Sequence, residues 1–344
     1  MANLPTDSIH PPIPPTSAQI CKRWLIVAMK WGIALVVIYG VWQNLQKAIV
    51  QVQEEGFQFA ELRWPFLVAA GLIYLIGSLP AGMFWYRLMR AMGQRPELGS
   101  VFRAFYIGHL GKYVPGKALV VVLRTALVRG DSIQRTVVAT AVFSETLTMV
   151  AVGGVYAAVL IALFFTHQTA LLALALIIAV GGVIVTSPPI FRKIVLVLRV
   201  AKLHPEIQEN LKGLSWPVML WGWAANLVGW SLLGGSLFAV MHAIPAAAPH
   251  LSGIVRSFPL LTATICLAMV AGFISPLPGG VGVREWVIIE MLAPDFGPVI
   301  AVVSAVLLRM TWLLAEVLFA MILYPLPLGT DPHAVSENPA PIGK

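Results

Sequence analysis

Residues 275–285 read SPLPGGVGVRE and interrupt an apolar stretch that extends from Ser257 to Ala293. Proline lacks a backbone donor and clashes with the preceding helical turn, while glycine tolerates non-helical dihedral angles. The segment therefore predicts a helix break, and its breaking residues are Pro276, Pro278, Gly279, Gly280 and Gly282. At membrane depth, such a break is tolerated only inside protein or beside a watery cavity.

A second apolar stretch, Ala104–Val128, is interrupted in the same way. Residues 111–117 read GKYVPGK, with Pro115 and Gly116 as the breaking residues. Pro115 and Pro278 are 163 residues apart, about half the chain. Two broken segments that enter from opposite faces are typical of an inverted repeat, whose discontinuous helices meet near the midplane.

The composition identifies the medium in which the chain folds. Of its 344 residues 58% are hydrophobic and 11% charged, and the mean hydropathy is +0.84. Soluble domains contain about 25% charged residues, so a soluble two-domain enzyme and a disordered chain are excluded. The two cysteines, Cys21 and Cys266, cannot form a disulfide framework, and we expect both to be free thiols. The class predicted is an all-α polytopic membrane protein.

Crossing a hydrocarbon core of ~30 Å requires roughly 20 apolar residues. Tryptophans at the ends of several apolar runs are typical of interfacial anchors, namely Trp24, Trp42, Trp64, Trp85 and Trp216. If the broken segments are re-entrant hairpins there are six spans, and if the second one forms two complete spans there are eight. The runs of adequate length are Trp24–Leu45, Trp64–Tyr86, Val137–Phe165, Ala170–Ile190, Trp216–Met241 and Val299–Leu323.

Charge distribution predicts the domain organisation and the orientation. Residues 1–23 hold five prolines and no apolar period, which indicates a disordered tail before one membrane domain over 24–323 and a short tail over 324–344. With the N-terminus in the cytoplasm, thirteen loop bases lie inside and three outside. The positive-inside rule then predicts a multi-pass protein of the cell (inner) membrane with both termini cytoplasmic. Because the bases of this +8 chain form short clusters instead of one stripe, we expect no nucleic-acid partner.

The few charges within the spans are the candidate functional residues, since an isolated charge at the bilayer centre costs roughly 2.5–3.5 kcal/mol on insertion scales. Lys112 and Lys117 flank the first break, and Arg124 follows it. These bases could snorkel to head groups. We favour a phosphate site instead, because Pro115-Gly116 begins a new helix beside Lys117.

Glu145 lies eight residues into its predicted span, about 12 Å from the end. It is either ion-paired, for instance to a hairpin base, or part of a substrate or proton site. Glu285 could be a capping acid in the first turn of its helix. We expect Lys117, Arg124, Glu145, Arg284 and Glu285 to converge on one polar cavity, where they pair partly with each other and partly with a lipid phosphate.

Other side chains are assigned structural roles or none. Arg309 and Glu316 are seven residues apart on one face of the last span, and we expect them to pair with other helices. The histidines at 109, 242 and 250 have no carboxylate or cysteine at metal-ligand spacing. The glycines of 279–282 are not a dinucleotide fingerprint, because no strand precedes them. We therefore predict no metal, no cofactor and no catalytic residue.

The residues Gly108–Arg124 and Pro276–Glu285 resemble the hallmark segments of the lysylphosphatidylglycerol synthase transmembrane region family, the flippase-like membrane proteins. The likeness includes Ser144-Glu145 and Leu308-Arg309 and covers about residues 24–323. Many members have a Gly-Glu pair where this chain reads ALVV at 118–121, and an acid where it reads TLT at 146–148. The resemblance implies a membrane half that moves an aminoacylated lipid between leaflets. The chain leaves no room for the soluble aminoacyltransferase half, so we do not expect synthase activity.

Three functions are compatible with this sequence. The first is a flippase or transporter-like protein for an anionic or modified phospholipid or a polyprenyl-phosphate lipid. The second is an integral-membrane head-group transferase with Glu145 or Glu285 as acid or base, which the lack of a nucleophile or metal set disfavours. The third is a non-catalytic subunit that houses a lipid-synthesising enzyme or glycosyltransferase. We favour the first, with membrane lipids as the partners.

Overall fold

The computed structural model describes Tyr39 and residues 61–113, 118–131, 133–164, 169–197, 207–251, 253–275, 280 and 282–326. The predicted N-terminal tail and, apart from Tyr39, the predicted span Trp24–Leu45 lie outside these residues. So do most of the C-terminal tail, Lys117 and several of the predicted breaking residues: Pro115, Gly116, Pro276, Pro278 and Gly279.

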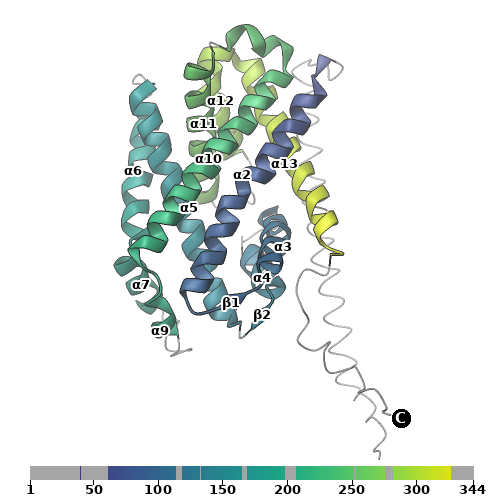
Figure 1. Ribbon diagram of the computed structural model, residues 1–344. Helices are drawn as coiled ribbons and strands as arrows, with labels where there is room; N and C mark the ends of the chain where they lie inside the picture. Colours follow the sequence, from purple (N-terminus) through teal and green to yellow (C-terminus); the bar gives the residue numbers. More distant parts are fainter. Residues whose placement is uncertain are drawn as a thin grey trace, which may run out of the picture.

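The described chain is a bundle of helices, which confirms the all-α polytopic class (Figure 1). Its five helices that are long and apolar enough to cross a membrane are α2 (Trp64–Ala91), α5 (Arg135–Phe164), α10 (Trp216–Ala243), α11 (Ile254–Ile274) and α13 (Pro298–Leu323). The shorter helices are α3 (Leu98–His109), η2 (Leu110–Tyr113), α4 (Ala118–Leu127), α9 (Ile207–Leu211), η3 (Pro245–His250) and α12 (Val283–Phe296). Two antiparallel two-residue strands, β1 (Arg95–Pro96) and β2 (Gly130–Asp131), pair at the lower end.

Four predicted spans coincide with α2, α5, α10 and α13 to within five residues at each end. The predicted span over Ala170–Ile190 is bent in the structure. The chain forms α6 (Thr169–Thr186) and α7 (Pro188–Val197), with a bend of 77° between them. The bend falls at consecutive prolines, Pro188 and Pro189, which cannot donate to the preceding turn and so end α6.

Both predicted breaks separate pairs of helices that pack on each other as hairpins. The first hairpin is α3, η2 and α4, in the lower half of Figure 1, and the second is α11 and α12, in the upper half. Their ends meet, because Lys112 and Tyr113 of the first line the same small cavity as Met269 and Arg284 of the second. The 14 residues of α12 would reach about 21 Å, too short for a complete span. The second broken segment is therefore not two complete spans.

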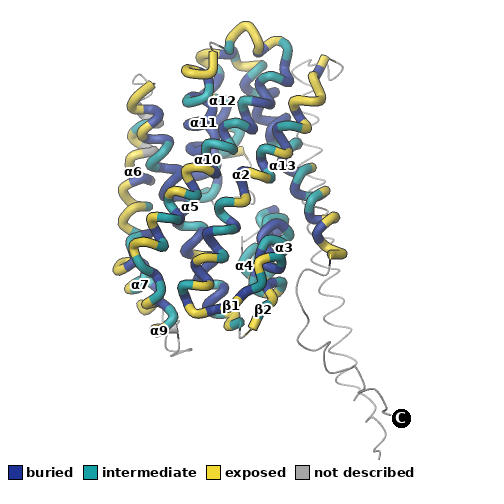
Figure 2. Tube along the Cα trace, viewed as in Figure 1, coloured by how far each residue is buried: buried dark blue, intermediate teal, exposed yellow. Residues whose placement is uncertain are grey.

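The bundle has two hydrophobic cores, one above the other. The upper core joins α10, α11, α12 and α13, with members such as Leu261 and Met291. The lower core joins the second half of α2 to α3 and the start of α5, with members such as Leu88 and Val138. Figure 2 shows both as buried stretches inside a layer of exposed residues. The described residues thus form two packed halves with the hairpin ends between them.

Close helix contacts depend on small residues, as is common in membranes. A Cβ added at Gly229 of α10 would lie 2.9 Å from the carbonyl oxygen of Gly77 in α2. Because no side chain stands between these backbones, α2 and α10 can pack closely, and this pair forms the central crossing in Figure 1.

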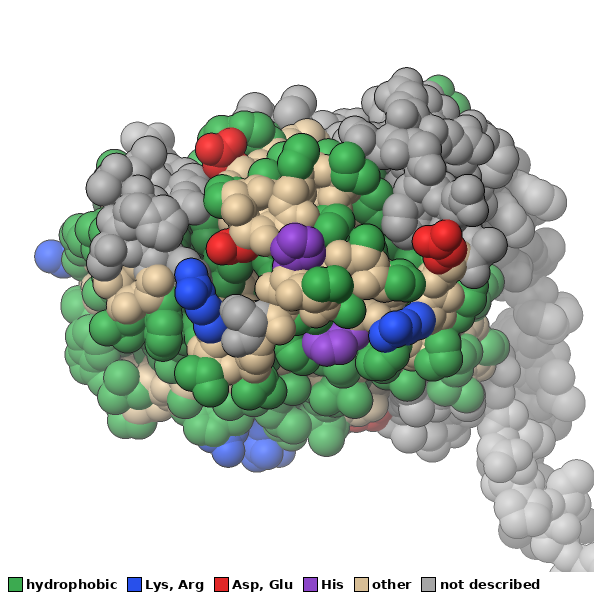
Figure 3. Space-filling view, turned by 90° about the horizontal axis from the view of Figure 1, so that it is seen from above, with side chains coloured by type: hydrophobic (Ala, Val, Ile, Leu, Met, Phe, Trp, Pro, Cys, Tyr) green, Lys and Arg blue, Asp and Glu red, His purple; other side chains and the backbone are tan. Residues whose placement is uncertain are grey.

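The outer surface is that of a membrane protein. Seen from above, hydrophobic side chains cover much of the described surface and charged ones are scattered (Figure 3). Trp64 and Trp216 begin their helices with 58% and 56% of their surface exposed, as interfacial anchors do. The prediction that Trp85 is such an anchor is wrong. Because α2 continues to Ala91, Trp85 lies inside the lower core, fully buried.

Candidate functional site

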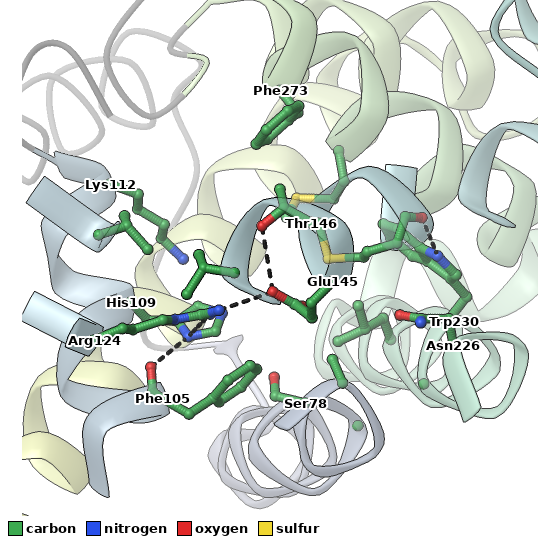
Figure 4. A pocket seen from close by; sticks show the side chains of 18 of the residues that line it. Ser78, Phe105, His109, Lys112, Arg124, Glu145, Thr146, Asn226, Trp230 and Phe273 are labelled. Atoms are coloured by element: carbon green, nitrogen blue, oxygen red, sulfur yellow. Dashed lines mark hydrogen bonds and ion pairs between the residues drawn. The ribbon is translucent and has the colours of Figure 1, made fainter. Parts of the chain in front are cut away.

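A cavity of about 340 Å³, here called the main cavity, lies where the two cores and the two hairpins meet. Tyr74 and Trp230 line it from the upper core, and Phe105 and Val142 line it from the lower core. Four of the predicted site residues also line it: Lys112, Arg124, Glu145 and Arg284. Figure 4 shows that its labelled polar residues come from different helices and surround one space.

Arg124 and Glu145 form a buried ion pair in the wall of the main cavity. Arg124 Nη1 donates to Glu145 Oε2 at 2.8 Å, and Thr146 Oγ1 donates to the same oxygen at 3.3 Å (Figure 4). Both charged side chains are almost fully buried. The pair joins the second arm of the first hairpin to α5, the span that follows it. Glu145 is therefore ion-paired to a hairpin base, one of its two predicted roles.

The position of Arg124 is fixed by its surroundings as well as by its partner. Its side chain passes over Gly108 of α3, where an added Cβ would lie 2.5 Å from Cγ of the arginine. Its guanidinium carbon lies 4.3 Å from the ring centre of Phe105 and 5.3 Å from that of Trp85. Cation–π contacts of this kind compensate part of the lost hydration of a buried arginine. The glycine and the two rings thus explain how a guanidinium is accommodated here.

Glu316 of α13 is the centre of a second buried cluster beside the main cavity. Glu316 is 2% exposed, and its carboxylate accepts hydrogen bonds from Lys112, Tyr74 and Tyr113, the last at 2.9 Å. Lys112 also forms a salt bridge with it. These contacts join α13 to α2 and to the end of the first hairpin. The expectation that Glu316 pairs with other helices is confirmed.

Glu285 has a structural role at the start of α12. Its Oε2 accepts the backbone N–H of Gly282 at 2.7 Å, which caps the helix, and its Oε1 forms a salt bridge with Arg309 of α13. Gly280 and Gly282 adopt φ of +67° and +83°, conformations that favour glycine. Glu285 does not line the main cavity, so the expected convergence of the charges does not extend to this residue.

Arg284 lies at the meeting point of the main cavity and the smaller one that Lys112 and Arg309 also line. Its side chain passes over Gly272 of α11, where an added Cβ would lie 2.4 Å from Cγ of the arginine. Arg284 is thus accommodated in the second hairpin in the same way as Arg124 is in the first. The correspondence is consistent with an inverted repeat.

Several residues of the site were not predicted. Tyr74 and Tyr113, the phenol donors to Glu316, gave no signal because tyrosine is common near membrane interfaces. Asn226 lies in the middle of a predicted span, and its amide could have been noticed as a polar group at membrane depth. It lines the main cavity (Figure 4) and donates to the carbonyl oxygen of Gly222 at 2.8 Å. Among the described residues, no group of His, Cys, Asp and Glu is arranged to hold a metal ion.

Two sequence departures noted above fall on the main cavity. Val120 and Val121 of the ALVV segment line it, and so does Thr146 of the TLT segment. The wall at these positions is therefore apolar or neutral in this chain.

Comparison with known proteins agrees with this architecture. Residues 29–320 match the family described as the lysylphosphatidylglycerol synthase TM region. The match spans both hairpins, the helices that pair with them and all but the last turn of α13. A search of curated proteins gives no match. The chain therefore belongs to the lysylphosphatidylglycerol synthase transmembrane region family.

Proposed function

We propose that the protein moves a phosphate-bearing lipid between the two leaflets of the membrane, with the head group passing through the main cavity. The observation that carries this proposal is the mixed character of the cavity wall. The charged residues Arg124 and Glu145 share it with apolar residues such as Phe143, which is 57% exposed at the surface of the bundle. A wall that is both charged and continuous with the bilayer suits an amphipathic ligand.

The size of the main cavity is consistent with a lipid head group. Its 340 Å³ is at the lower end of the roughly 300–1,000 Å³ typical of small-molecule sites. A head group fits this volume, while the acyl chains would remain in the bilayer beside Phe143. Two hairpins that meet from opposite ends, around a polar site, are a recurrent design of membrane transporters. Membership of the family supports the same reading.

We also propose that the lower end of Figure 1 faces the cytoplasm, with both termini on that side. The described loops and short elements at this end carry Arg95, Arg129, Arg192 and Lys212, whereas Arg63 and Arg256 lie near the upper end. Excess Lys and Arg in short loops marks the cytoplasmic side.

Lipid movement is tested with the purified full chain in liposomes that contain a fluorescent phosphatidylglycerol. Leaflet exchange is measured by adding an impermeant quencher to the outside. The variant Val121→Trp places a large ring in the main cavity, and we expect it to slow exchange. The matched control is Val122→Trp, because Val122 is the next residue of α4 but is 53% exposed and does not line the main cavity. A second filling variant, Leu233→Trp, blocks the same cavity from α10.

The proposal requires that wild type and Val122→Trp exchange lipid faster than the two filling variants. Equal exchange by all four proteins would mean that lipid does not pass through the main cavity. Absence of exchange in the wild type, in liposomes of several lipid compositions, would instead favour a subunit that anchors a lipid-modifying enzyme.

A further inference from the structure

The charges around the main cavity do not balance. Among the described residues, three cations line it: Lys112, Arg124 and Arg284. Lys112 is paired with Glu316, and Arg124 is paired with Glu145. Three cations against two carboxylates leave one positive charge, and it belongs to Arg284.

Arg284 lacks a hydrogen-bonded or ion-paired partner in the described part of the chain. Its Nε is buried without a hydrogen-bond partner, and its guanidinium makes no hydrogen bond or ion pair with a described residue. The adjacent carboxylate of Glu285 is occupied by the N–H of Gly282 and by Arg309. Because Arg284 passes closely over Gly272, its position at the junction of the two cavities is fixed. An unpaired charge at membrane depth is costly, which points to a ligand that supplies the missing anion.

We propose that Arg284 makes the main cavity selective for lipids whose head group carries one net negative charge, and that the cavity discriminates against aminoacylated, net cationic lipids. This inference rests on the proposed function. A guanidinium is suited to the phosphodiester, because its planar fork donates two parallel hydrogen bonds to phosphate oxygens. A single phosphodiester also matches the single uncompensated charge.

A lysylated head group is a poor match for the same wall. It carries two ammonium groups beside its phosphate, and each would need a carboxylate when removed from water. Glu145 is the one carboxylate among the described lining residues, and Arg124 already occupies it. Val120, Val121 and Thr146, which lie near this pair, offer no negative charge. The ammonium groups would remain without partners.

The first experiment compares lipids in the exchange assay described above, with phosphatidylglycerol, lysylphosphatidylglycerol and phosphatidylcholine as the transported probes. We expect phosphatidylglycerol to exchange at least about tenfold faster than the lysylated lipid, the factor that one charge-assisted hydrogen bond provides. Arg284→Gln removes this preference, whereas Arg284→Lys retains its direction. The matched control is Arg256→Gln, which removes an exposed arginine from the start of α11, away from both cavities. Val120→Glu adds a carboxylate to the wall and shifts the preference toward the lysylated lipid.

The second experiment measures binding without transport. The melting temperature of the detergent-purified chain is measured in the presence of dioctanoyl phosphatidylglycerol, its lysylated counterpart or inorganic phosphate. We expect the anionic lipid alone to raise the melting temperature of the wild type and of Arg256→Gln, and to have no effect on Arg284→Gln.

The two experiments separate the inference from the function on which it depends. Stabilisation by the anionic lipid through Arg284, without exchange of any lipid, would support the selectivity and reject the transport. Exchange of the lysylated lipid as fast as of phosphatidylglycerol, or an unchanged preference in Arg284→Gln, would overturn the selectivity while leaving transport intact. Equal stabilisation by inorganic phosphate would overturn the assignment of the site to a lipid.

Discussion

Replacing Glu145 by glutamine is expected to destabilise the protein through the arginine that it leaves behind. Arg124 is 4% exposed and has Glu145 as its ion-pair partner at 2.8 Å. Breaking a buried pair by removing one member costs about 3–5 kcal/mol, because the remaining charge stays buried. The glutamine amide can still accept one hydrogen bond, and the ring contacts with Phe105 and Trp85 persist. We therefore expect the free energy of unfolding to fall by about 3 kcal/mol, at the lower end of this range.

The assay is equilibrium unfolding of the purified chain in mixed micelles, followed by circular dichroism. A double-mutant cycle with Arg124→Gln, Glu145→Gln and both together isolates the coupling between the two side chains. We expect about 1.5 kcal/mol or more of coupling, because the double variant leaves no unpaired charge. The control is Glu209→Gln, which removes one member of an exposed pair with Lys212 and should cost at most about 0.5 kcal/mol.

The reasoning is refuted if Glu145→Gln costs no more than Glu209→Gln. It is also refuted if the coupling energy is below about 0.5 kcal/mol, the range expected for side chains that act independently. Either result would mean that Arg124 finds other compensation in the folded protein.

Three further predictions follow from the same contacts. Gly272→Ala should lower the free energy of unfolding by about 1–3 kcal/mol, because the added methyl group overlaps the side chain of Arg284. The control is Gly181→Ala, which should not lower it because the space around Gly181 is open. Glu316→Gln should lower the free energy of unfolding by about 3 kcal/mol and Tyr113→Phe by about 1 kcal/mol. Equal losses in the two variants would contradict the conclusion that the Glu316 carboxylate is the centre of its cluster. In a cysteine-free background an impermeant maleimide applied to intact cells should label Arg256→Cys and not Lys212→Cys, and the reverse pattern would invert the proposed topology.

Much of the fold was predictable because bilayer physics leaves few alternatives. Continuous apolar runs gave the ends of α5, α10 and α13 to within two residues. Proline and glycine clusters gave the two hairpins. The bend between α6 and α7 was missed, although Pro188 and Pro189 lie within the predicted span. The high average hydropathy of residues 170–190 predicted one span in spite of these two prolines.

The candidate site was only partly predictable, because pairing depends on side-chain geometry that spacing does not encode. Membrane depth alone was enough to select Arg124 and Glu145. The sequence could not show that Glu285 turns to Arg309 and to its own helix start while the adjacent Arg284 faces the main cavity. Arg284 and Glu285 are consecutive residues of α12, so the helix directs their side chains to different neighbours. Nor could it show that Lys112 is neutralised by Glu316, which is 204 residues away in the chain.

The cluster around Glu316 has a mechanical consequence. Three donors from two separate segments converge on one carboxylate of α13, so the end of the first hairpin is fastened to a rigid frame made of α2 and α13. Any rearrangement that swings this hairpin away from the frame must break two contacts to a buried anion together, those of Lys112 and Tyr113. The second hairpin is held to α13 by the upper core and by the pair of Glu285 and Arg309, at the partly exposed beginning of α12. The first hairpin is thus held to α13 by a buried polar cluster, and the second by apolar packing in the upper core with an ion pair at its end.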